Sequence, residues 1–126
     1  MKGMADGTIN RINFLSEVGI DDDAADTLLR QTFETIFFDN VNGLVYRTSE
    51  DAWCIVDTGN QDVRSEGMSY GMMMCVQMDR QDIFDKLWTF ATRYMLIHDG
   101  PYRGYFAWSV APDGHVNHKS PAPDVE

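Results

Sequence analysis

Two consecutive helical patterns, joined by a very short link, constrain the fold of this chain more than any other feature. Apolar side chains recur at helical spacing from about Asp62 to Met78, and again after Asp79 to about Ile97. The link is residues 79–81, and Asp79 is the predicted N-cap of the second helix. Because so short a link leaves no room for another element, the helices are expected to pair as an antiparallel hairpin. The sequence therefore predicts a mainly α-helical protein.

The first of these helices begins with a carboxylate and contains two glycines. Glu66 stands where a polar loop passes into the apolar helix, and Gly67 and Gly71 follow it at helical spacing. Glycine inside a helix costs about 1 kcal/mol relative to alanine, so the pair indicates that another backbone or a ligand lies close against this helix. The methionines of the same helix are interpreted as adaptable core. They are Met68, Met72, Met73, Met74 and Met78.

The N-terminal third of the chain predicts two further helical stretches. Ile9–Val18 is short and amphipathic and ends at Gly19, which suits a helix C-cap. A stronger helix is predicted from about Asp22 to Phe38, because three consecutive aspartates favour its N-terminus. Its apolar face comprises Ala25, Leu28, Leu29, Thr32, Phe33, Ile36 and Phe37.

Short strands and turns are predicted around the helical hairpin. Leu44–Tyr46 and Trp53–Val56 form a hairpin candidate. Tyr105–Val110 is strand-like, and a hairpin turn follows at Pro112–His115. Pro123-Asp124 has the pattern of a helix start.

Charge and composition exclude several classes of function. The 126 residues carry a net charge of −10, which argues against nucleic acid or an anionic membrane surface as a partner. No run approaches the roughly 20 apolar residues of a membrane span, and the first seven residues lack the apolar core of a secretory signal. A cytoplasmic protein is therefore expected. Cys54 and Cys75 lie in apolar runs and are interpreted as buried free thiols.

Three motifs suggest other chemistry, and each is disfavoured by its context. Residues 67–71 match the G-x-S-x-G pattern of a serine nucleophile, but polar residues rather than a strand precede them, so a nucleophilic Ser69 is disfavoured. A loop with Asx turns explains residues 57–62 better than a calcium site. His115 and His118 are interpreted as exposed loop residues rather than zinc ligands. No Rossmann or Walker pattern follows a strand, so a nucleotide cofactor is not indicated. With the calcium and zinc motifs disfavoured as well, neither a metal nor a cofactor is expected.

Carboxylates accompanied by aromatic residues form the remaining candidate site. Glu66 and Asp124 stand at two loop-to-helix junctions, and aromatic residues lie between them in the sequence. These are Tyr102, Tyr105 and Trp108. Carbohydrate sites use aromatic faces to stack on sugar rings and carboxylates to bind hydroxyls and move protons. The combination favours a sugar-binding site.

Several separated blocks of this sequence resemble glycoside hydrolase family 8. They are the segments 57–72, 77–80 and 84–88, the run Gly104-Tyr105-Phe106-Ala107-Trp108, and the run Ser120-Pro121-Ala122-Pro123-Asp124. The resemblance extends from about Phe14 onward and is greatest to reducing-end xylose-releasing exo-oligoxylanases. It implies an (α/α)6 barrel with short β-hairpins in the cleft loops, and an inverting hydrolase of β-1,4-linked xylo-oligosaccharides. Residues 1–126 would then form the N-terminal part of a single catalytic domain.

The resemblance also implies roles for individual residues. The S-E-G-x-x-Y-G-M block places the general acid at Glu66, and the P-A-P-D block makes Asp124 the aspartate that binds the sugar at the cleavage subsite. Trp108 matches a cleft tryptophan, Arg64 is a partner for the acid, and Tyr102 is expected to bind substrate. In family members the catalytic base lies beyond the position equivalent to residue 126, and glycine stands where this chain has Val125.

An inverting acid must hold its proton near neutral pH. The helix dipole opposes this at Glu66, so burial against the methionine-rich face or the charge of Asp124 would have to outweigh it. A chain that carries the acid without the base is expected to be inactive alone and to self-associate through exposed helix faces. The alternatives are a fragment of an endo-β-1,4-xylanase or glucanase of the same family, or a non-catalytic carbohydrate-binding or interaction fragment.

Overall fold

The structure, a computed structural model, describes residues 14–121 of the chain. The chain divides into two compact units, Met1–Gly43 and Leu44–Glu126. No helix in the described part of the chain is long and apolar enough to cross a membrane.

The first unit contains two helices, α1 (Phe14–Glu17) and α2 (Asp22–Phe38). The predicted bounds of α2 are confirmed at both ends. At its N-terminus, Asp21 caps the helix by accepting a hydrogen bond from the Ala24 N–H at 2.9 Å. Gly19 ends α1 with φ +90°, as expected for a C-cap glycine. Residues 9–13 of the predicted first stretch lie outside the described residues.

The predicted apolar face of α2 is only partly buried. Ala25, Phe33 and Phe37 are buried, and the two phenylalanine rings stack with their centroids 4.3 Å apart. Leu28 and Leu29 are instead about half exposed. Within the first unit, α1 is only four residues long, too short to cover the whole face of a 17-residue helix.

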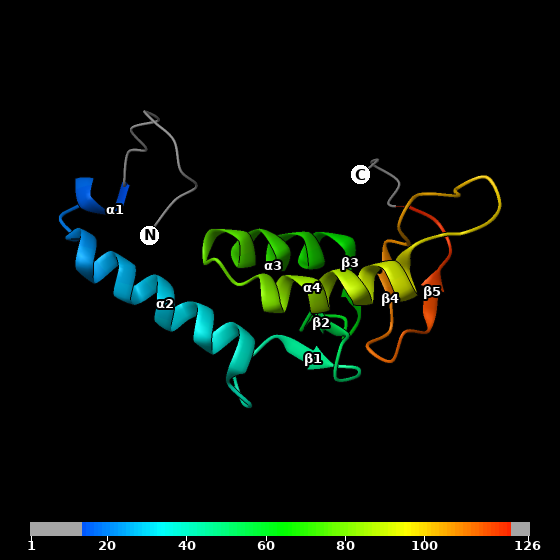
Figure 1. The fold of residues 1–126 in the computed structure, drawn as a ribbon, viewed down its shortest axis with the longest axis horizontal. Coiled ribbons are helices and arrows are strands. Elements are labelled where there is room, and N and C mark those ends of the chain that lie inside the picture. Colours follow the sequence, from blue (N-terminus) through cyan, green and yellow to red (C-terminus); the bar gives the residue numbers. More distant parts are fainter. Residues whose placement is uncertain (1–13, 122–126) are drawn as a thin grey trace. The chain divides into compact units, whose positions relative to one another are not determined.

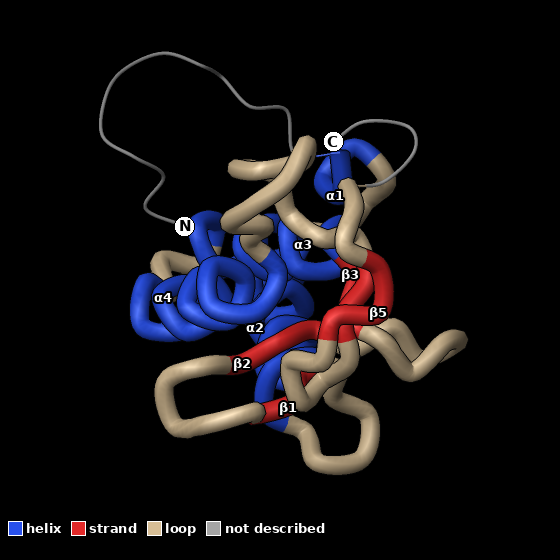
Figure 2. Tube along the Cα trace, turned by 90° about the vertical axis from the view of Figure 1, so that its right-hand side faces the viewer, coloured by secondary structure: helices blue, strands red, loops and turns tan. Residues whose placement is uncertain are grey.

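The second unit contains two small antiparallel sheets (Figure 2). The first confirms the predicted hairpin and pairs β1 (Val45–Arg47) with β2 (Trp53–Ile55). The second has the order β3-β4-β5, with β3 at Val63–Arg64, β4 at Ser109–Val110 and β5 at Val116–His118. The predicted turn at Pro112–His115 lies between β4 and β5, where the Ala111 N–H donates to the His115 carbonyl. The second sheet thus joins the segment just before Glu66 to a segment far along the chain.

Two boundaries differ from the prediction. Val63 and Arg64 were expected inside the helix but pair with Val110 and Ser109 as a strand. The predicted strand Tyr105–Val110 is a strand only at its last two residues, because Phe106 forms an isolated bridge with Leu96 instead. Both differences arise from strand pairing between distant segments.

The helical hairpin is confirmed. Helices α3 (Ser65–Gln77) and α4 (Gln81–Phe90) lie side by side, and α4 continues as a π-helical turn, η1 (Ala91–Met95) (Figure 1). The predicted N-cap role of Asp79 is wrong: Asp79 has φ +55°, and Arg80 occupies the N-cap position without a side-chain cap bond. In this tight link the Arg80 N–H donates a hydrogen bond to the Cys75 carbonyl of α3 at 2.8 Å.

The core of the second unit lies between the helical hairpin and the sheets. Its largest buried side chains come from α3, α4, η1 and the strands. They include Val63, Met68, Ile83, Leu87, Phe90, Met95 and Val110. Cys54 and Cys75 are free and buried, as predicted, and burial raises the pKa of their thiols to about 12 and about 11.

The two glycines of α3 differ in how closely they approach their neighbours. A Cβ on Gly71 would lie 2.8 Å from Ile55 Cγ1 and 3.3 Å from Leu87 Cδ1, whereas a Cβ on Gly67 would lie 3.7 Å from Ile55 Cγ2. The prediction of close packing is therefore confirmed at Gly71, where α3 lies against β2 and α4. At Gly67 the contact would be ordinary.

Substitution of these two glycines by alanine should affect stability differently. We expect Gly71→Ala to lower the free energy of unfolding, because overpacking costs about 1–3 kcal/mol. Gly67→Ala should be neutral or stabilising by up to about 1 kcal/mol through helix propensity. Urea unfolding of both variants measures the difference, expected at about 2 kcal/mol. Equal stability of the two variants would show that Ile55 moves aside without cost.

Candidate functional site

Glu66 lies in the first turn of α3, where strand β3 passes directly into the helix. The Ser65 N–H donates to the Trp108 carbonyl at 3.2 Å, which fixes the start of the helix beside strand β4. The Glu66 side chain is exposed. The expected burial of Glu66 against the methionine-rich face of its helix is therefore not found within residues 14–121.

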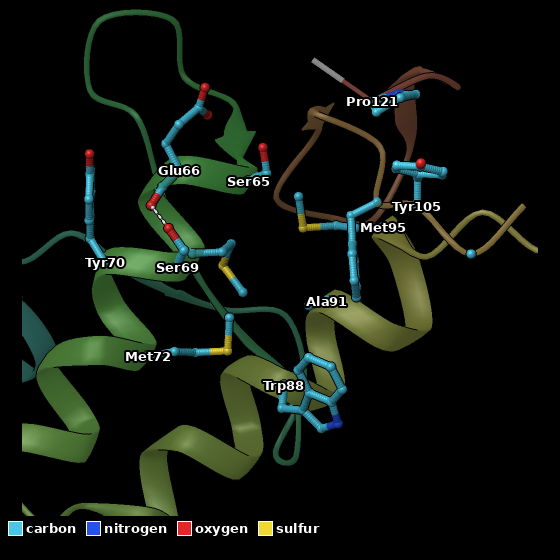
Figure 3. Close-up of a pocket in the computed structure, with 13 residues that line it drawn as sticks. Ser65, Glu66, Ser69, Tyr70, Met72, Trp88, Ala91, Met95, Tyr105 and Pro121 are labelled. Carbon is cyan, nitrogen blue, oxygen red and sulfur yellow. Dashed lines mark hydrogen bonds between the residues drawn. The ribbon is translucent and has the colours of Figure 1, made fainter. Parts of the chain in front are cut away.

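A cavity of about 490 Å³ lies beside Glu66 (Figure 3). Met68 and Met72 of α3 line it from one helix, and Ala91 and Met95 of η1 line it from the other. Trp88 of α4 also lines it. The remaining lining includes Gly104, Tyr105, Phe106 and Pro121. An apolar cavity with a carboxylate at its edge is typical of a site that binds a small organic ligand.

Exposed aromatic side chains surround this cavity. Tyr70 is 65% exposed, Tyr105 48% and Trp88 47%. Of these three residues, only Tyr105 is among the site residues predicted from the sequence; Tyr70 and Trp88 are not. Helical spacing could have indicated Tyr70, since residues four apart share a face of a helix and Tyr70 follows Glu66 by four. Trp88 reaches the cavity because α4 pairs with α3. Helical periodicity alone does not indicate this pairing of faces.

Two expected substrate-binding residues lie elsewhere in the second unit. Neither Trp108 nor Tyr102 is among the described residues that line the cavity. The Trp108 ring stacks on His118, with centroids 4.8 Å apart and an interplanar angle of 16°. Tyr102 lies in a turn and is partly exposed. His118, expected in a loop, is therefore a strand residue whose ring contacts an aromatic side chain.

Arg64 is engaged by two aspartates of the preceding loop. Its Nε lies 3.1 Å from Asp62 Oδ1 and 3.3 Å from Asp57 Oδ2, and its guanidinium carbon lies 5.5 Å from the centre of the Trp108 ring. These contacts direct the Arg64 charge toward the loop and Trp108. The expected partnership of Arg64 with Glu66 stays a prediction.

The loop before β3 is held by an Asx turn, as predicted. Asp57 Oδ1 accepts hydrogen bonds from the backbone N–H groups of Gly59 and Asn60, and Asp57 Oδ2 accepts from the Asn60 side chain. The hydrogen bond from the Asn60 side chain, then the two backbone donors and the nearby Arg64 charge, lower the pKa of Asp57. Within residues 14–121 no group of three or more His, Cys, Asp or Glu side chains is placed to hold a metal ion.

Ser69 lies inside α3 rather than on a sharp turn between a strand and a helix. Its hydroxyl donates to the Glu66 carbonyl at 2.8 Å, one helical turn back. This geometry differs from that of a nucleophile elbow, and the interpretation of residues 67–71 as helix is confirmed. Asp124, the second expected carboxylate, lies outside the described residues.

Comparison with known proteins places this arrangement in a family. The family model for glycosyl hydrolases family 8 matches residues 42–124. The chain belongs to family 8. The match covers almost all of the second unit, including Glu66, the cavity lining and Trp108.

Individual relatives are identical to this chain at nearly half of the aligned positions. Two reducing end xylose-releasing exo-oligoxylanases, from Halalkalibacterium halodurans and Bifidobacterium adolescentis, are each 46% identical over 115 and 114 residues. A solved structure of Rex8A from Paenibacillus barcinonensis complexed with xylose superimposes with a TM-score of 0.83 at 44% identity over 89% of this chain. The chain spans about 30% of the length of these family 8 relatives.

Proposed function

We propose that this chain is the N-terminal part of an inverting glycoside hydrolase that releases xylose from the reducing end of β-1,4-linked xylo-oligosaccharides. The observation that carries the proposal is the position of Glu66 at the edge of a cavity with exposed aromatic side chains, within the segment that matches family 8. The similarity to two reducing end xylose-releasing exo-oligoxylanases supports xylo-oligosaccharides as the substrate class.

The proposed complete fold is an (α/α)6 barrel. The antiparallel pair of α3 and α4, with short β-hairpins in the adjoining loops, is the kind of unit from which such a barrel is built. Since the chain spans about 30% of its relatives' length, we infer that residues 1–126 supply part of one catalytic domain and that further helices complete the ring.

In the proposed mechanism Glu66 protonates the oxygen of the leaving sugar. A second carboxylate, supplied by the part of the domain outside these 126 residues, activates water on the opposite face of the sugar ring. Inverting enzymes hold these two carboxyls about 6.5–9.5 Å apart. Asp124 would bind the sugar at the cleavage subsite and help to position the water. Because residues 14–121 leave Glu66 exposed at a helix N-terminus, the groups that enclose it in the complete active site would come from the remaining helices and from Asp124.

Aromatic residues provide the proposed sugar-binding surface. Tyr70, Trp88 and Tyr105 lie around the cavity and offer faces for the apolar sides of sugar rings. Trp108 and Tyr102 lie outside the cavity lining and would serve more distant parts of the substrate. No cofactor is needed for this reaction, since two carboxyl groups and a water supply its chemistry.

A chimeric enzyme tests the proposal directly. This chain replaces the matching N-terminal 30% of the Bifidobacterium adolescentis relative, and xylose release from xylotriose is measured. We expect hydrolysis by the chimera and none by the 126-residue chain alone. A correctly folded chimera that binds xylotriose without cleaving it would favour the non-catalytic carbohydrate-binding alternative.

The 126-residue chain alone is also expected to self-associate. Tyr70, Met73 and Val76 form an exposed apolar strip along α3, and Met73 and Val76 are 59% and 55% exposed. Apolar strips of this kind promote association in water. Size-exclusion chromatography should show oligomers that Val76→Glu reduces, whereas Gln77→Glu, an equal charge change beside the strip, should reduce them less. A monomer that binds no hydrophobic dye would contradict this expectation.

A further inference from the structure

Ser109 and Asp62 form a polar contact in the otherwise apolar interior of the second unit. Among residues 14–121, Ser109 is the buried polar side chain, only 2% exposed. Its hydroxyl donates to Asp62 Oδ2 at 2.6 Å and accepts from Asn117 Nδ2 at 3.1 Å. A hydrogen bond from a hydroxyl to a carboxylate is stronger than one between neutral groups. The loop before β3 is therefore fastened to β4 and, through Asn117, to β5.

The other oxygen of Asp62 fixes a cation over an aromatic ring. Arg64 Nε donates to Asp62 Oδ1 at 3.1 Å, and Asp57 Oδ2 lies 3.3 Å from the same nitrogen. The guanidinium carbon lies 5.5 Å from the centre of the Trp108 ring, within the range of a cation–π interaction. Because Arg64 is held by carboxylates, its place beside Trp108 depends on them.

Trp108 is thus tied to Asp62 by two routes. One route runs through Ser109, its neighbour in sequence, and the other through Arg64, beside its ring. The carbonyl of Trp108 accepts the hydrogen bond from Ser65, the residue before Glu66. A displacement of Trp108 would therefore be transmitted to the start of the helix that carries Glu66.

We propose that Asp62 is a positioning residue, which holds the Trp108 indole in its orientation relative to Glu66 for sugar binding. The sugar-binding part of this inference rests on the proposed function. The two oxygens of Asp62 accept from two donors on different elements, Ser109 and Arg64. An amide of the same shape has one acceptor oxygen and no charge, so Asp62→Asn loosens both routes with little change in volume.

The first measurement examines the orientation of Trp108 in the 126-residue chain. Asp62→Asn should shift the indole N–H resonance of Trp108 and the ring C–H resonances of His118, because the stack of the two rings loosens. Asp82→Asn is the matched control. Asp82 also pairs with an arginine two residues away, and its Oδ1 lies 3.0 Å from Arg80 Nε. This pair lies in the exposed first turn of α4 and has no contact with Trp108 among those described above. The control should leave both resonances in place.

The second measurement examines sugar binding. In the chimera with the Bifidobacterium adolescentis relative, Asp62→Asn should raise KM for xylotriose about tenfold, since small displacements of positioning groups weaken productive binding strongly. Ser109→Ala should produce the same change, and the double variant should cost little more than either single one, because both act through one contact. Asp82→Asn should keep the KM of the unsubstituted chimera.

The outcomes separate the two proposals. If the unsubstituted chimera fails to bind or cleave xylotriose, the proposed function fails, while the resonances of Trp108 and His118 still decide whether Asp62 positions the ring. Unchanged resonances in Asp62→Asn would overturn the positioning role. Shifted resonances with an unchanged KM would also overturn it and would leave Asp62 with a purely structural role.

Discussion

Glu66→Gln should reduce xylotriose hydrolysis by the chimera about 10²–10⁴-fold, the usual contribution of general acid catalysis. Glutamine keeps the size of the side chain and its place in the first turn of α3 but has no proton to give to the leaving oxygen. Glu66 contributes to the lining of the cavity, and because glutamine keeps the size and polarity of the side chain, we expect the affinity for substrate to change little. Steady-state kinetics should therefore show a loss in kcat with nearly constant KM.

A matched control is available in the same unit. Glu50 is an exposed carboxyl in the turn between β1 and β2, where its backbone carbonyl accepts a hydrogen bond from Lys86. Glu50→Gln should retain full activity, since the side chain that changes lies outside the cavity lining. Equal activity of Glu66→Gln and the unsubstituted chimera would remove Glu66 from the mechanism. Loss of ester hydrolysis on Ser69→Ala would instead support the serine nucleophile.

Phe90→Ala should lower the free energy of unfolding of the second unit by about 3–5 kcal/mol. Phe90 is fully buried at the end of α4, and its ring lies 5.0 Å from that of Tyr94. Removal of the ring leaves a cavity at the point where α4 passes into η1. A loss of this size is a large fraction of the stability of a typical domain, 5–15 kcal/mol.

The control for this variant is Phe84→Ala on the same helix. Phe84 is only partly buried, so less surface is lost from the core and the expected cost is about 1 kcal/mol. Urea unfolding followed by circular dichroism at 222 nm would compare the two variants. A similar cost for both would show that the junction of α4 and η1 repacks around the missing ring.

Elements specified by nearby residues could be predicted from the sequence. Helix α2 agrees at both ends because its cap, its acidic first turn and its apolar period are all local signals. The helical hairpin was also predicted, because its link is short. The N-cap role of Asp79 was wrong, since a link this tight requires a left-handed residue, and Asp79 adopts that conformation.

Elements specified by distant residues could not be predicted. Strand β3 exists because Val63 and Arg64 pair with Val110 and Ser109. Asp62 and Ser109 are 47 residues apart in the chain, so helical periodicity around residue 62 gives no sign of the contact. The same limit applies to the candidate site. Glu66 was predicted at the start of its helix, whereas Trp88 reaches the cavity only through the pairing of two helices.

The reactivity of the two cysteines would report local unfolding of this chain. Thiol reagents attack the thiolate, and burial raises the pKa of Cys54 to about 12 and that of Cys75 to about 11. At neutral pH both sulfurs therefore stay protected while the second unit is closed, and the sequence contains no other cysteine to react in their place. Cys54 lies on β2 and Cys75 on α3, so their separate labelling rates would report how often the hairpin strand and the helix beside it come apart. The two native cysteines thus serve as probes of local unfolding, and no engineered probe is needed.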